Sequence, residues 1–89
     1  MWHEGIIAST TTNAKFKYWA KVYDEPSETY GLDGGCISKL TIRKLGESRD
    51  IVNFDRGWDV TVPDDEEVRA VYNIILAKYN NGGQSDDLQ

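Results

Sequence analysis

Lysines and aromatic residues alternate along one segment of the chain, and this pattern has the most chemical potential. Alternate side chains of a β-strand point to opposite faces of the sheet, so residues 15–23 would carry one basic and aromatic face. The side chains on that face are Lys15, Lys17, Trp19, Lys21 and Tyr23. Rings stack on bases and ammonium groups neutralise phosphates, so the face could bind a nucleotide or a nucleic acid. Lysines that screen aromatics on an open face, or protect an edge strand, explain the same pattern without a ligand.

A second candidate is the segment 54–59, which reads FDRGWD. Its glycine allows a sharp bend between an arginine and a tryptophan, and those two residue types dominate the energetics of protein interfaces. The residues that could anchor a partner here and in the preceding loop are Tyr30, Asp55, Arg56, Trp58 and Asp59. The alternative is structural: Trp58 closes the end of the core while Arg56 pairs with a neighbouring aspartate.

Catalysis and metal binding have little support in the sequence. Cys36 and His3 are the only cysteine and histidine, and neither has a catalytic motif around it. The acidic residues of the segment 24–35 lack calcium-loop spacing, and those at 64–67 are explained by helix capping. We therefore predict no catalytic residue, no metal site and no cofactor, and interpret the chain as non-enzymatic.

Charge and composition narrow the class of partner and the compartment. The chain of 89 residues has 15 acidic and 10 basic residues, a net charge of −5. Such a surface repels nucleic acid and anionic lipid, and suits solubility or a partner with a basic groove. A single cysteine, the lack of a signal-like N-terminus and a longest apolar run of only residues 74–77 predict a cytoplasmic protein without membrane contact.

Apolar periodicity predicts the secondary structure. Period-two alternation and turn residues indicate strands at 2–9, 15–23, 36–44 and 50–55, a short extended piece at 60–62, a loop at 24–35 and a hairpin turn at 45–48. A helix is predicted over 64–79, with Asp64 as its N-cap and Glu67 completing a capping box. Its apolar face comprises Val68, Val71, Tyr72, Ile75 and Tyr79, with Lys78 in the last turn and residues 80–83 as its stop.

These elements predict an α+β fold, an antiparallel sheet of about four strands packed by one C-terminal helix as a two-layer sandwich. Residues 1–81 would form a single domain, and 82–89 a polar, frayed tail. The side chains expected to face the helix are Phe16, Tyr18, Ala20 and Val22, with Lys17, Trp19 and Lys21 facing away.

Four segments of the chain carry a resemblance to a known group of proteins. They are FKYW at 16–19, YDEPS at 23–27, GG at 34–35 followed by ISKL at 37–40, and DRGWD at 55–59. Together they resemble a family of short domains of unknown function from Gram-positive bacteria and their phages, over about residues 2–80. The resemblance implies no activity and no site residue, only a phage or mobile-element origin.

The leading functional hypothesis is a non-enzymatic protein-binding module. The resemblance suggests a phage-encoded inhibitor of a host defence or nucleic-acid enzyme, whose partner is a host protein with a basic groove. The alternative is a small-ligand or nucleotide-binding protein that uses Lys17, Trp19, Lys21 and Tyr23. A homodimer that pairs through an edge strand with Trp19 and Tyr23 is a further possibility.

Overall fold

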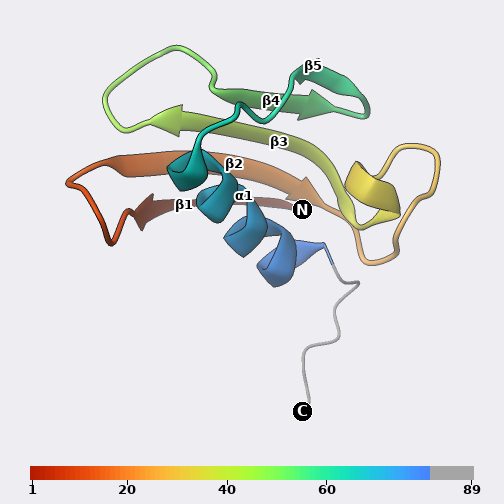
Figure 1. The fold of residues 1–89 in the computed structure, drawn as a ribbon. Coiled ribbons are helices and arrows are strands. Elements are labelled where there is room, and N and C mark those ends of the chain that lie inside the picture. The colour runs from red at the N-terminus through yellow and green to blue at the C-terminus, as the bar shows by residue number, and fades with distance from the viewer. Residues whose placement is uncertain (81–89) are drawn as a thin grey trace.

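Each strand of the sheet pairs with the next strand of the sequence, so the chain forms an antiparallel meander in the order β1-β2-β3-β4-β5. The computed structural model describes residues 1–80. The elements are β1 Trp2–Ala8, β2 Lys15–Val22, the 3₁₀ turn η1 Leu32–Gly34, β3 Ile37–Lys44, β4 Val52–Asp55, β5 Trp58–Val60 and α1 Glu66–Tyr79. The helix lies across one face of the sheet and leaves the other face without a second layer (Figure 1).

The sheet has five strands rather than the expected four. The segment 56–59 was expected to interrupt the strand pattern with a sharp bend, and it forms a tight reversal from which β5 begins at Trp58. The amide of Asp55 donates to the carbonyl of Gly57 at 2.8 Å, and Arg56 adopts a positive φ of 55°. This turn pairs Trp58 with Phe54. The fifth strand was missed because it is three residues long and begins directly after its turn.

The alternative prediction that β2 is an edge strand is wrong. It pairs with β1 on one side and β3 on the other, so it is central, and the edges are β1 and β5. Trp19 and Tyr23 therefore cannot take part in edge-to-edge pairing through β2. The prediction failed because alternation within one segment does not show which strands pair with it on either side.

The core lies between the sheet and α1. Phe16, Tyr18 and Ala20 of β2 are buried there, which confirms the predicted polarity, and Val22 packs against the same cluster. The other buried members are Leu32, Ile37, Leu40, Ile42, Val52, Phe54, Val68, Val71 and Ile75. The second face of the strands therefore contributes nothing to the core.

The start of α1 differs from the predicted capping box. Asp65, not Asp64, is the N-cap, and its carboxylate accepts hydrogen bonds from the amides of Glu67 and Val68 at 2.9 and 3.1 Å. The side chain of Glu67 instead accepts hydrogen bonds from Ser9 and Thr12 in the β1–β2 turn, and these lower the pKa of its carboxyl group. Glu67 thus attaches the helix to a distant turn.

Asn80 ends the helix and joins it to the rest of the domain. Its amide donates to the carbonyl of Leu76. Its side chain accepts from the amide of Ile37 and donates to the carbonyl of Leu32, both at 2.8 Å. Leu32 is fully buried, so the loop 24–35 is packed onto the domain at this point. The expected stop at 80–83 and the tail at 82–89 extend outside the described residues.

The position of the N-cap is testable by a pair of alanine substitutions. Asp65→Ala removes the acceptor of two helix amides and should lower the free energy of unfolding by about 1 kcal/mol, or the melting temperature by about 4–8 °C. Asp64→Ala removes only an exposed ion pair with Arg69 at 3.1 Å and should cost less than about 0.5 kcal/mol. Thermal unfolding by circular dichroism measures both. A larger loss for Asp64→Ala would contradict the assignment.

Candidate functional site

The uncovered face of the sheet brings together side chains from four strands, and we name it the outer face. Strand register aligns them in three rows. The rows are Trp2, Lys21, Lys39 and Asp55; Glu4, Trp19, Thr41 and Asn53; and Ile6, Lys17 and Arg43. Of the predicted binding residues, Lys17, Trp19, Lys21 and Asp55 lie here. Tyr23 follows β2 directly and lies beside Lys21.

Cationic groups lie over the aromatic rings of the outer face. The ammonium of Lys17 is 5.2 Å from the ring centroid of Trp19, and the guanidinium carbon of Arg43 is 5.4 Å from it. The ammonium of Lys21 is 6.0 Å from the Trp2 ring and 5.5 Å from the Tyr23 ring. Each such contact contributes about 0.5–1 kcal/mol at an exposed site, so the contacts favour this arrangement of the side chains.

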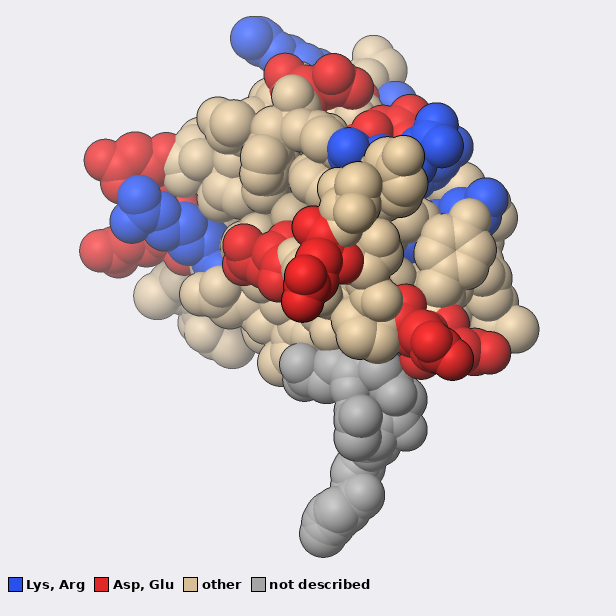
Figure 2. Space-filling view, turned by 90° about the vertical axis from the view of Figure 1, so that its right-hand side faces the viewer, with Lys and Arg blue, Asp and Glu red and all other residues tan. Residues whose placement is uncertain are grey.

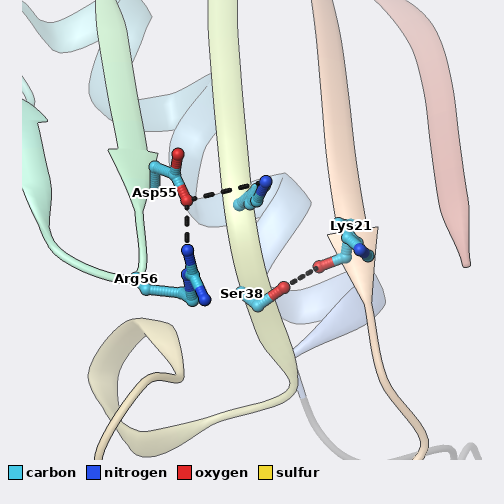
Figure 3. Close-up of polar contacts among 5 residues, drawn as sticks. Lys21, Ser38, Asp55 and Arg56 are labelled. Atoms are coloured by element: carbon cyan, nitrogen blue, oxygen red, sulfur yellow. Dashed lines mark hydrogen bonds and ion pairs between the residues drawn. The ribbon is translucent and has the colours of Figure 1, made fainter.

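Most cations of the outer face also have a carboxylate partner. Lys17 lies 3.8 Å from Glu4, and Lys39 lies 3.8 Å from Asp55. Figure 3 shows Asp55 between a β3 side chain and Arg56, whose guanidinium is 3.6 Å away. The outer face is therefore close to charge balance, unlike a surface built to hold a phosphate backbone.

Arg43 makes the tightest ion pair, at the β4 end of this face. Its Nε donates to Asp50 at 2.6 Å, and Asn53 donates to the same carboxylate at 2.8 Å. These hydrogen bonds, that from Arg43 above all, lower the pKa of the Asp50 carboxyl group. Lys21, in contrast, forms no salt bridge within the described residues, so its charge is available to a partner.

A hollow of about 330 Å³ opens on the outer face. It is lined by Trp2, Trp19, Thr41 and Arg43. Trp19 is half-buried beneath its cationic neighbours, whereas Trp2 is 57% exposed. Two indole rings, a hydroxyl and a guanidinium are suited to one planar group with a polar or anionic edge.

The predicted binding residues of the 54–59 segment do not lie together. Trp58 is on the helix side, where its ring centroid is 5.1 Å from Phe54 and 6.1 Å from Tyr72. Arg56 sits in the turn and pairs with Asp55, while Asp59 is exposed in β5. The structure thus has the arrangement of the structural alternative, in which Trp58 packs on the end of the core.

Tyr30 lies in the loop 24–35, outside the strands of the outer face. It is 56% exposed, and its backbone amide donates a hydrogen bond to the hydroxyl oxygen of Ser27 at 3.0 Å. Figure 2 views the molecule from the loop end of the sheet and shows acidic and basic side chains interspersed there. The net negative charge is therefore not gathered into one acidic patch on this side.

Sequence reasoning missed Trp2, Ile6 and Arg43 as members of the outer face. Their alternation was visible in the segments 2–9 and 36–44. What was lacking was the strand order, which places these two segments on either side of β2.

The two residues considered for catalysis, Cys36 and His3, have different surroundings. Cys36 is buried, and the ring of His3 stacks on Tyr79 at 4.8 Å. The hydroxyls of Tyr79 and Tyr18 lie 2.8 Å apart, and burial followed by this hydrogen bond raises the pKa of Tyr18 to about 12. Residues 1–80 contain no group of histidine, cysteine or acidic side chains arranged for a metal ion.

The fold and the outer face define a small α+β protein with one aromatic sheet face whose cations mostly have carboxylate partners. The chain belongs to the family described as Domain of unknown function (DUF7678), whose family model matches residues 1–80. The kinship with a family of unknown function was expected and is confirmed. No curated protein and no solved structure matches the chain. Within residues 1–80 no helix has the length and apolar character that a membrane crossing needs.

The packing role of Trp58 is testable by substitution. Trp58→Ala removes its ring contacts with Phe54 and Tyr72, and because the side chain is 43% exposed the free energy of unfolding should fall by only about 2 kcal/mol. Asp59→Ala, one residue along β5, should change it by less than about 0.5 kcal/mol. Urea denaturation measures both. Equal stabilities of the two variants would show that Trp58 is not a packing residue.

Proposed function

We propose that this protein is a non-enzymatic protein-binding module and that the outer face is its docking surface. The observation that carries the proposal is the exposed apolar area on a face that no helix or strand of residues 1–80 covers. Trp2 is 57% exposed, Ile6 55% and Tyr23 51%. Contiguous exposed apolar groups rimmed by polar residues are typical of interaction sites.

The residue types of the outer face favour a protein partner over nucleic acid. Tryptophan, tyrosine and arginine contribute most of the binding energy in protein interfaces, and all three occur here. A nucleic acid would need an excess of free cations, whereas Lys17, Lys39 and Arg43 each have a carboxylate neighbour. The net charge of −5 acts against a polyanion at longer range.

The sequence suggests more specific features of the protein's origin, location and partner. A Gram-positive or phage origin, a cytoplasmic location and inhibition of a host defence or nucleic-acid enzyme with a basic groove all remain predictions. The outer face supports docking as such and does not choose among these partners. Lys21 favours a partner that places an acidic group at the centre of the interface.

Capture from a lysate of the encoding cell, with matched variants, tests the docking surface. Tyr23→Ala and Lys21→Glu should each weaken retention of a stoichiometric partner by about tenfold or more, since loss of a central anchor costs over about 1.4 kcal/mol. Tyr30→Ala is the control, because Tyr30 is as exposed as Tyr23 but lies in a loop. The proposal fails if no stoichiometric partner is retained, or if Tyr30→Ala weakens retention as much as Tyr23→Ala.

A second candidate function, the binding of a planar anionic ligand such as a nucleotide, is supported by the hollow between Trp2 and Trp19. The base would stack on the indole rings while Arg43 and Lys21 neutralise phosphate. A nucleotide at 100 times its dissociation constant should add about 2.7 kcal/mol to the stability, and Trp2→Ala should abolish the thermal shift while Tyr30→Ala preserves it. The absence of a shift with every common mono- and dinucleotide would exclude this function.

A further inference from the structure

The free edge of β1 lacks the features that normally prevent one sheet from pairing with another. The strand has seven residues, its pairing with β2 contains no bulge, and Glu4 is its only charged side chain. The opposite edge, β5, has three residues, a register irregularity and an aspartate. Natural edge strands are usually short, bulged or charged, so β5 is protected and β1 is open to a further strand.

Alternate residues of β1 direct their backbone groups towards β2 or towards the free edge, and the hydrogen bonds to β2 show which residues could bind a further strand. The amide of Val22 donates to the carbonyl of Met1 at 2.8 Å, and that of Ser9 to Ala14 at 2.9 Å. Since bonded pairs alternate along an antiparallel ladder, the odd-numbered residues of β1 use their backbone groups on β2. The even-numbered residues, Trp2 to Ala8, therefore direct theirs towards the free edge.

A second copy of β1 can form hydrogen bonds with these even-numbered residues when the two strands run antiparallel about a two-fold axis at Gly5. All seven residues of the strand then pair, and the even residues form the hydrogen-bonded pairs. The pairs are Trp2 with Ala8, His3 with Ile7, Glu4 with Ile6, and Gly5 with Gly5. No like charges face each other in this register, whereas an axis at Glu4 would oppose two carboxylates.

The side chains along the edge also suit a second copy. Gly5 would occupy the non-hydrogen-bonded position on the axis, where the strands come closest and a missing Cβ is an advantage. On the helix side, a hollow of about 250 Å³ lies beside β1; Ile7, Ala70 and Ile74 form part of its wall, together with polar residues of the β1–β2 turn and two glutamates at the start of α1, and Ile74 is 50% exposed. The register brings His3 of the second copy against Ile7, at the rim of that hollow.

We propose that two copies of this chain associate through β1, with antiparallel pairing about Gly5, so that the two sheets become continuous. The outer faces of both copies then lie on one side of this sheet and the helices on the other. Association buries Ile7 and covers the free backbone groups of β1 on both chains. The two proposals share β1 residues, since Trp2 and Ile6 also belong to the outer face, but this inference uses the backbone groups at the edge of β1, whereas Tyr23 and Lys21 of the docking site lie away from that edge.

Two variants of the full-length chain that carry opposite charges at position 6 test the register. Ile6→Glu places a carboxylate opposite Glu4 of the second copy, twice by symmetry, and should weaken the dimer by about tenfold or more. Ile6→Lys places an ammonium opposite Glu4 and should retain it. Adding Glu4→Lys to Ile6→Glu should restore the dimer of the weakened variant. Sedimentation equilibrium across a concentration series measures the dissociation constants.

The fold of the variants controls the experiment, because Ile6 is paired with Lys17 of its own chain. Within one chain Ile6→Glu adds an attraction and Ile6→Lys a repulsion, the reverse of their effects across the dimer. Loss of the dimer in Ile6→Glu with an undiminished melting temperature therefore supports the interface. A wild type that stays at the 10.1 kDa mass of one chain, or equal dimer strength in both variants, overturns it.

Discussion

The packing of one amphipathic helix against one face of the sheet is the interaction on which the rest of the structure depends. The helix α1 supplies Val68, Val71 and Ile75 to the core, and it is the only α-helix within residues 1–80. Because so short a chain buries limited apolar area, polar contacts at both ends of the helix matter more than in a larger domain. Glu67 fixes its start to the β1–β2 turn, and Asn80 fixes its end to η1 and β3.

Because α1 covers one face of the sheet, the other face depends on contacts among its own side chains. The ammonium groups of Lys17 and Lys21 and the guanidinium of Arg43 lie over the indole and phenol rings of this face. The same arrangement keeps tryptophan and tyrosine at a surface where burial by a partner would be favourable. The residues that make the contacts of the outer face are thus the same residues that we propose as the docking surface.

The sequence predicted those properties that depend on local periodicity. Alternation in residues 15–22 gave the correct division between core and outer face, and the 3.6-residue pattern gave the helix and its buried side. The N-cap was misplaced by one residue because both Asp64 and Asp65 are good capping residues, and only the backbone geometry distinguishes them. Strand order, the short β5 and the meeting of Trp2, Trp19 and Arg43 depend on long-range pairing, which no local pattern encodes.

The side chain of Asn80 has a consequence for the way the domain comes apart. Its amide group serves the carbonyl of Leu32 and the amide of Ile37, which are 48 and 43 residues away along the chain. If the loop, the third strand or the end of the helix separated from the others, a part-buried backbone group would lose its hydrogen bond to Asn80. Partial opening at this end is therefore penalised, and these three segments should exchange their amide hydrogens with solvent as one cooperative unit.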